Sequence, residues 1–210
     1  GCGGRREGWR REEMVMEETM SLRAGKTRSM RYAANDVKWH PSTEFHSILA
    51  SGSTDGSVVL WDITRGHDVT HTLGGKTRAV NRVAWHPVDR SLLLSGGQDG
   101  AVRMWDWRSN TATDESIATW NVHLASTASG VRDVAFSPLS PNHFAAVYDS
   151  GGLKLFDVRV PSAVLSTTRA HAGPALSLSW HPFAAALMAT AGRDQTIRVW
   201  NVEALLGGGA

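Results

Sequence analysis

The stretch SGSTDGSVVLWD, residues 51–62, decides the fold because related stretches return three more times along the chain. The second copy is SGGQDGAVRMWD at residues 95–106, and the fourth is TAGRDQTIRVWN at residues 190–201. A shorter third copy, GGLKLFD, occupies residues 151–157. The aromatic residues that close the copies are 44, 51 and 44 residues apart: Trp61, Trp105, Phe156 and Trp200. This period indicates a repeat architecture in which neighbouring units stack.

Each copy lies among signals for antiparallel strands. Val83 and Trp85 alternate with their neighbours, which is the period of a strand, and a His-Pro turn follows them. Asp-Gly at residues 55–56 and 99–100 is a strong signal for a hairpin. We therefore expect an all-β chain of four blades with four antiparallel strands each. The expected repeats span about 31–74, 75–125, 126–168 and 169–203, between a basic segment at 1–30 and a Gly-rich tail at 204–210.

These repeats resemble the WD-repeat β-propeller superfamily. The resemblance implies a hydrogen-bonded tetrad of His, Ser or Thr, Asp and Trp inside each complete blade. Only the last unit matches in full, with His171, Thr190, Asp194 and Trp200. Partial sets without a histidine are Ser51, Asp55, Trp61 and Ser95, Asp99, Trp105, and Lys76 stands where the second unit would have its histidine. The third unit has Ala146, Ser150 and Phe156 at these offsets, so we expect no such network there.

Ser or Thr, His and Asp together also compose a nucleophilic catalytic triad. A catalytic site occurs once, however, whereas this set recurs in near-copies along the chain. The tryptophan that closes each set also has an indole N–H that needs an acceptor when it is buried. We therefore expect a structural network and no enzyme.

The composition indicates neither a metal site nor a nucleic-acid site. Cys2 is the only cysteine, so no internal disulfide and no cysteine-based zinc site can form, and a reducing compartment is expected. His40, His86 and His181 occupy the same turn in different blades, too far apart for a shared metal. The basic excess lies in residues 1–31, and the repeats carry none for phosphate contacts. We expect no cofactor, no nucleic acid, no membrane insertion and no small-molecule substrate.

The order of the units is similar to consecutive blades of the WD repeat-containing protein 24 family. The similar stretches include ANDVKWHP (34–41), LLSGGQDG (93–100), VRDVAFS (131–137) and AHAGP (170–174). This family contributes a subunit to the GATOR/SEA complex, upstream of the TOR kinase. The resemblance implies a non-catalytic scaffold that binds fellow subunits, in the cytoplasm and at the cytosolic face of the lysosome or vacuole.

Family members are longer, with further blades and a cysteine-rich RING-type region. This chain has too few cysteines for that region, so ligase activity is not carried over. Residues 12–22 resemble the last strand of a preceding blade, and we expect the four blades to form an open ring.

An alternative is a substrate receptor of a cullin-type ubiquitin ligase. Trp105, Asp106 and Arg108 are similar to the WD-x-Arg box that docks on the ligase adaptor. Another WD-repeat scaffold is a further alternative.

The candidate partner-binding residues lie at strand starts and turns that should share one rim of the ring. By their position in the repeat these are Asn35, Thr54, Asn81, Gln98, Arg132 and Arg193. Arginine is enriched at protein interfaces, and ordinary solvated loop residues remain the alternative reading.

Overall fold

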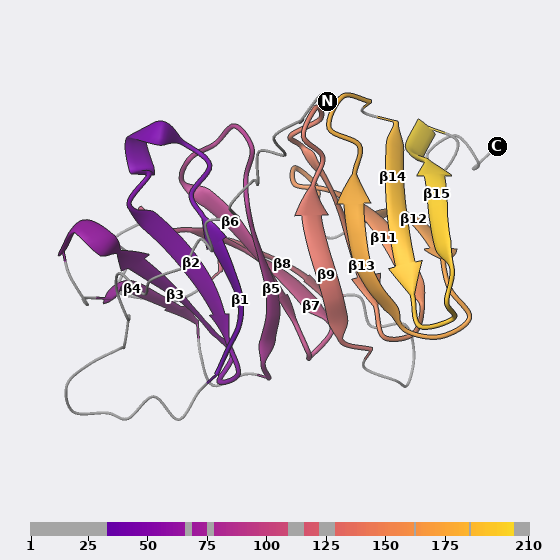
Figure 1. The fold of residues 1–210 in the computed structure, drawn as a ribbon, viewed down its shortest axis with the longest axis horizontal. Helices are drawn as coiled ribbons and strands as arrows, with labels where there is room; N and C mark the ends of the chain where they lie inside the picture. Colours follow the sequence, from indigo (N-terminus) through magenta and orange to yellow (C-terminus); the bar gives the residue numbers. More distant parts are fainter. Residues whose placement is uncertain are drawn as a thin grey trace, which may run out of the picture.

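The structure is a computed structural model that describes residues 33–65, 69–74, 78–108, 116–121, 129–161, 163–184 and 186–203. These residues form four antiparallel sheets, which follow one another in chain order (Figure 1). We call them blades 1 to 4. The first and the last blade lie at opposite ends of the molecule, so the blades form an open arc. The all-β fold and the open arrangement predicted from the repeats are therefore confirmed.

The strands of each blade are consecutive in the chain. Blade 1 holds β1 (Ala34–Trp39), β2 (Ile48–Ser53), β3 (Ser57–Asp62) and β4 (Val69–Gly74). Blade 2 holds β5 (Val80–Trp85), β6 (Leu92–Gly97), β7 (Ala101–Asp106) and β8 (Ala118–Asn121). Blade 3 holds β9 (Val131–Phe136), β10 (His143–Tyr148), β11 (Gly152–Asp157) and β12 (Val164–Arg169). Blade 4 holds β13 (Ala175–Trp180), β14 (Leu187–Gly192) and β15 (Ile197–Asn201). Two short 3-10 helices, η1 (Thr43–Phe45) and η2 (Ile63–Arg65), lie in blade 1.

Blade 4 differs from the expectation of four strands, because its described part has three. In the other blades the fourth strand comes from the segment that leads toward the next blade, and the described residues stop at Glu203. The expected strand at 12–22, the basic segment at 1–30, Lys76 and the tail at 204–210 all lie outside the described residues.

Within the described ranges, no helix combines the length and the apolar character needed to cross a lipid bilayer.

Left-handed residues close the turn between the second and third strand of each blade. Gly56, Gly100 and Gly151 have φ angles of 87°, 86° and 81°, a region that glycine enters without a steric penalty. Blade 4 has Gln195 at this position, with φ 63°. The Asp-Gly pairs therefore form the hairpins that the sequence predicts, and blade 4 makes the same turn with a less suitable residue.

The hydrophobic core lies between blades rather than inside one sheet. Val58 and Leu60 of β3 pack in one cluster with Val83, Leu93 and Trp105 of blade 2. The junction of blades 2 and 3 has the same arrangement, and so does that of blades 3 and 4. Because each blade buries its faces against its neighbours, the first strands β1, β5, β9 and β13 lie next to one another across the arc (Figure 1).

Candidate functional site

The four residues of the last unit form one continuous chain of hydrogen bonds. Trp200 Nε1 donates to Thr190 Oγ1 over 2.9 Å, and Thr190 Oγ1 lies 2.9 Å from His171 Nε2. His171 Nδ1 lies 2.9 Å from Asp194 Oδ1. A carboxylate only accepts, so Nδ1 carries the proton toward Asp194, and in the neutral imidazole Nε2 accepts from the threonine hydroxyl. Each side-chain polar group in this hydrogen-bonded network therefore has a partner.

Several donors surround the Asp194 carboxylate. Burial raises the pKa of this carboxyl group, but hydrogen bonds from Ala172 N–H, from Thr196 and from His171 outweigh it. The net result is a pKa well below the ordinary value of 3.8. Asp194 therefore stays ionised near neutral pH and fixes the histidine ring.

This network is closed to substrates. His171 and Thr190 are each 1% exposed, and the threonine hydroxyl already takes part in two hydrogen bonds. A nucleophile needs access to a substrate and a free base, and the arrangement offers neither. In this arrangement the buried polar groups serve as hydrogen-bond partners for one another.

In blades 1 and 2 the serine and the tryptophan meet without the aspartate. Trp61 Nε1 donates to Ser51 Oγ over 2.9 Å, and Trp105 Nε1 donates to Ser95 Oγ over 2.8 Å. Asp55 instead accepts from the Ser57 backbone and hydroxyl, which stabilises the turn. Asp99 pairs with Arg103 at 2.6 Å. The two partial sets therefore split into a buried Ser–Trp bond and a separate turn aspartate.

Blade 3 replaces the network with aromatic packing. Phe156 stacks on Phe144 with ring centroids 4.8 Å apart, and both side chains are fully buried. Lys154 is 5% exposed, with its Nζ 4.8 Å from the centre of the Tyr148 ring. Burial lowers the pKa of Lys154, and the buried Tyr148 hydroxyl has no hydrogen-bond partner in the described structure. Sequence reasoning missed this pair, although a lysine on a strand that otherwise reads as core was the available signal.

Two of the candidate rim residues bind the next blade. Asn35 Nδ2 donates to the Val80 carbonyl over 2.9 Å, and Asn81 Nδ2 donates to the Val131 carbonyl over 2.7 Å. These amides bridge blades 1 and 2 and blades 2 and 3, so their polar groups are occupied within the arc.

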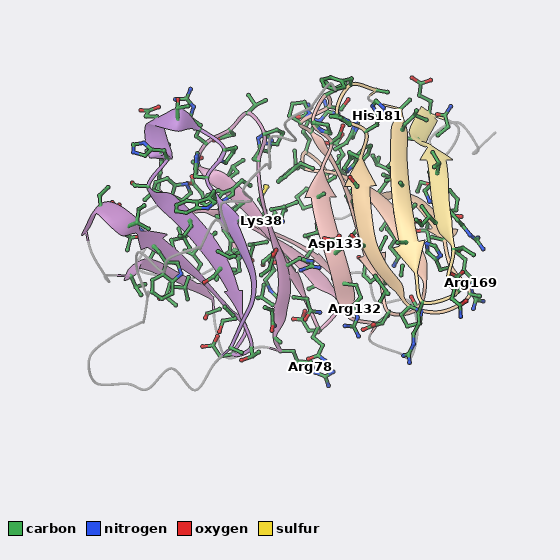
Figure 2. All side chains as sticks on the ribbon, viewed as in Figure 1. Lys38, Arg78, Arg132, Asp133, Arg169 and His181 are labelled. Carbon is green, nitrogen blue, oxygen red and sulfur yellow. The ribbon has the colours of Figure 1, made fainter. Side chains whose placement is uncertain are left out.

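The other four rim candidates are exposed: Thr54, Gln98, Arg132 and Arg193. Arg132 forms an ion pair with Asp149, and Figure 2 shows it with Arg78 and Arg169 along the lower edge of the molecule. The structure thus gathers basic side chains on the rim where β9 begins.

The inner surface of the arc is an open groove of about 660 Å³, lined by β1, β5, β9 and β13. Asp36, Arg82 and Asp133 occupy one repeat position in blades 1, 2 and 3. Arg82 lies between the two carboxylates, 3.7 Å from Asp36 and 3.5 Å from Asp133. Figure 2 marks Asp133 on β9 and Lys38 on β1. Together with Lys38, which also lines the groove, the two cations offset the two carboxylates, so the groove shows no strong charge preference.

Two further hydrogen bonds link the first strands of neighbouring blades. Trp85 Nε1 donates to the Lys38 carbonyl over 3.1 Å, and the Val83 N–H donates to Asp36 over 3.0 Å. The junction of blades 3 and 4 repeats both, from Trp180 to the Ala135 carbonyl and from the Leu178 N–H to Asp133. Blades 2 and 3 have neither, because Arg82 and Phe136 stand at these positions. Sequence reasoning missed these bonds since they join residues of different repeats.

The candidate ligase-adaptor box is engaged inside the chain. Trp105 is 4% exposed and bonded to Ser95, and Asp106 accepts the Arg108 N–H over 3.0 Å. The Arg108 guanidinium lies 4.7 Å from the centre of the Phe45 ring and 5.6 Å from that of Trp107. Such cation–π contacts hold the arginine against blade 1.

The turn histidines serve the blade junctions. The His40 ring lies 4.6 Å from Trp85, and the His86 ring lies 4.7 Å from Phe136, in each case an aromatic of the next blade. His181 is exposed in the last blade. No three histidine, cysteine or acidic side chains gather as a metal site in the part of the chain that the structure describes.

Comparisons with known proteins agree with this architecture. Residues 24–209 match the family of β-propellers described as "Nucleolar protein 10-like, N-terminal domain". The zebrafish (Danio rerio) GATOR2 complex protein WDR24 is 34% identical over 91% of this chain, which spans 24% of that protein. The Dictyostelium discoideum GATOR2 complex protein WDR24 is 37% identical over 87% of this chain, which spans 18% of it.

Among solved structures, a chain of a mitotic checkpoint complex shares the fold. Its TM-score is 0.70 at 23% identity, over 85% of this chain and 50% of the other. At this identity the likeness concerns the fold alone.

Proposed function

The chain belongs to the β-propeller family described as "Nucleolar protein 10-like, N-terminal domain", and from that premise we propose that it is a non-catalytic scaffold in a GATOR2-like complex. The support is the similarity to proteins named GATOR2 complex protein WDR24, at 34% and 37% identity in two distant organisms. The chain spans only about a quarter of their length or less, so the partners of the whole relatives are proposed here for this chain.

A more specific proposal concerns where in the cell the protein acts and in which signalling pathway. Acting with fellow subunits, the chain would contribute to signalling toward the TOR kinase in the cytoplasm, at the cytosolic face of the lysosome or vacuole. It would need no cofactor and would bind other proteins rather than nucleic acid or a small substrate.

One observation supports a scaffold over an enzyme: in the part of the chain that the structure describes, the set that resembles a catalytic triad is buried and its polar groups are satisfied. His171, Thr190, Asp194 and Trp200 use their polar atoms on one another, with the histidine and the threonine 1% exposed. A reactive site would instead have a nucleophile that is accessible from a cleft.

The test is copurification from cells that make the protein. The full chain carries an affinity tag, and the bound proteins are quantified by mass spectrometry. We expect GATOR2-type subunits to be enriched over a tag-only control. Enrichment of a cullin adaptor without those subunits would contradict the proposal and favour the ligase receptor. In that case Arg108→Ala should abolish adaptor capture, since the box depends on this arginine.

A further inference from the structure

The turn after the second strand carries an aspartate in blades 1, 2 and 4 and a serine in blade 3. The aspartates are Asp55, Asp99 and Asp194, and the serine is Ser150. Each aspartate folds over the residue two positions further on and accepts its main-chain N–H, at 3.0, 3.1 and 3.3 Å. Among the described blades, blade 3 alone has no carboxylate at this position.

The side chain four residues after this position is a cation in three of the blades. Arg103 pairs with the aspartate of blade 2 at 2.6 Å, and Arg198 lies 3.8 Å from that of blade 4, whereas blade 1 has Val59 here. Blade 3 has Lys154, and no carboxylate among the described residues pairs with it. Its Nζ lies instead 4.8 Å from the centre of the Tyr148 ring. Blade 3 thus keeps the cation of an ion pair without the anion.

The burial of Lys154 makes a missing anion costly. The side chain is 5% exposed, and burial lowers its pKa. A contact with an aromatic ring offsets only part of the cost of removing an ammonium group from water. An anion at the turn would therefore stabilise Lys154, as the aspartates stabilise the arginines of blades 2 and 4.

The Ser150 hydroxyl is accessible and lies on the side of the turn where the aspartates bind. Ser150 is exposed, and its N–H donates to Ser129 Oγ over 2.7 Å. Its own Oγ lies over Gly152, 3.5 Å from the point where a Cβ on that glycine would stand. Neither Gly151 nor Gly152 has a side chain that shields the hydroxyl.

We propose that Ser150 is a phosphorylation site, and that its phosphate replaces the missing aspartate as the anion that pairs with Lys154. A phosphoserine carries a charge of about −1.5 to −2 near neutral pH and three acceptor oxygens. A serine kinase supplies the phosphoryl group from ATP. The Ser150 oxygen bonds to the γ-phosphorus, the bond to the ADP oxygen breaks, and the hydroxyl proton passes to the catalytic base of the kinase.

The neighbouring charges are compatible with a phosphate at this turn. Asp149 precedes the serine, but it already pairs with Arg132, so its negative charge is offset. Hydrogen bonds between an ammonium group and a phosphate are among the stronger ones in proteins. Phosphorylation should therefore draw Lys154 from the aromatic ring to the turn and tie β11 to the hairpin. This inference concerns the chain alone and does not depend on the proposed function.

The first experiment asks whether cells modify Ser150. The full chain is purified with phosphatase inhibitors from cells that make the protein, and it is digested with trypsin. The peptide of residues 133–154 holds three serines, Ser137, Ser140 and Ser150. Ser137 is 1% exposed and serves as the internal control. Fragment ions should place a phosphate on Ser150 and none on Ser137. Recovery of this peptide without phosphate on Ser150 would overturn the proposal.

The second experiment tests the pairing with Lys154. The full chain is made with phosphoserine encoded at position 150, and its melting temperature is compared with that of the unmodified chain. The phosphate should raise the melting temperature by a few degrees. Lys154→Met keeps the length of the side chain without its charge and should remove most of this gain. Lys154→Arg is the matched control and should retain it, since arginine pairs with the turn aspartate in blades 2 and 4.

Circular dichroism confirms that each variant folds before the comparison is made. An equal gain in the wild type and in Lys154→Met would overturn the pairing, and so would a phosphate that lowers the melting temperature of the wild type.

Discussion

At the scale of single residues, one histidine decides how a blade uses its aspartate. Where His171 is present, Asp194 is drawn into the chain that ends at Trp200. In blade 2, whose Lys76 lies outside the described residues, Asp99 pairs with Arg103 instead. The Ser–Trp bond survives in both incomplete blades, because a buried indole N–H needs an acceptor whether or not the histidine is present.

The first prediction concerns the hydroxyl at the centre of the tetrad. Thr190→Val should lower the free energy of unfolding by about 1–3 kcal/mol, because it leaves the Trp200 indole N–H and the Nε2 atom of His171 without a hydrogen-bond partner. Chemical denaturation measures the change. The matched variant is Thr167→Val on β12, whose hydroxyl belongs to no such network, and it should change stability little. Equal losses for the two variants would count against the structural role of the tetrad.

The second prediction compares two aspartates. Asp194→Ala should reduce the melting temperature more than Asp149→Ala, because Asp194 accepts several hydrogen bonds whereas Asp149 pairs with the exposed Arg132. Differential scanning calorimetry gives both values. Similar melting temperatures would show that the carboxylate of blade 4 contributes no more than a surface ion pair.

The third prediction is a pH dependence at the same residue. The folded pKa of Asp194 lies below the ordinary value of 3.8, so folding stabilises its ionised form. This stability is present at neutral pH and is lost as the pH falls, progressively below about pH 5. The difference in melting temperature between wild type and Asp194→Asn should therefore shrink as the buffer is made more acidic. A difference that stays constant down to about pH 2 would contradict the assignment.

At the scale of strands and turns, the sequence predicted most of what the structure shows. The Asp-Gly pairs predicted the hairpins at Gly56 and Gly100, since glycine adopts their positive φ freely. The period of 44 to 51 residues predicted four antiparallel blades. Bonds between blades, such as Trp85 to the Lys38 carbonyl, could not be predicted because they depend on how two separate sheets face each other. For the same reason the repeat positions of Asn35 and Asn81 predict a place on the binding rim, whereas in the structure their amides bridge neighbouring blades.

The fourth prediction concerns the turn of blade 4. Gln195 has φ 63°, where a side chain costs roughly 1–2 kcal/mol, and glycine avoids this cost. Gln195→Gly should therefore raise the free energy of unfolding by up to about 1 kcal/mol. The gain is smaller than the relieved strain because glycine also increases the conformational entropy of the unfolded chain. Gly151→Ala is the reverse case and should destabilise, because its φ is 81° and a Cβ would collide with the carbonyls of His171 and Gly173. Loss of stability in Gln195→Gly would contradict this reading of the turn.

At the scale of the whole molecule, the two rims of the arc differ. The rim where β9 begins carries Arg132 and Arg193, both exposed, whereas the opposite rim holds Arg108 against aromatic rings. Partner binding on the basic rim stays a prediction from the repeat positions.

The fifth prediction tests that rim. Reversing both charges, Arg132→Glu with Arg193→Glu, should reduce capture of partner subunits several-fold while the melting temperature stays close to that of the wild type. The control is Arg159→Glu, which removes an arginine paired with Asp157 at the end of β11, on the opposite rim. Quantitative pulldown from cells reads out the capture. Unchanged capture by the double variant would remove this rim from consideration.

The junction of blades 2 and 3 lacks the indole bond and the bond from a main-chain N–H to a carboxylate that the other two junctions have, and this has a thermal consequence. It keeps the Asn81 amide bond and the Arg82–Asp133 ion pair, and otherwise it depends on an apolar cluster that includes Val102, Val134 and Phe144. Burial of apolar surface is driven by entropy near room temperature, so the stabilisation that it provides weakens on cooling. The stabilisation that hydrogen bonds provide to the other junctions changes less with temperature. Cooling should therefore loosen the arc at its middle, leaving blades 1 and 2 as one unit and blades 3 and 4 as another.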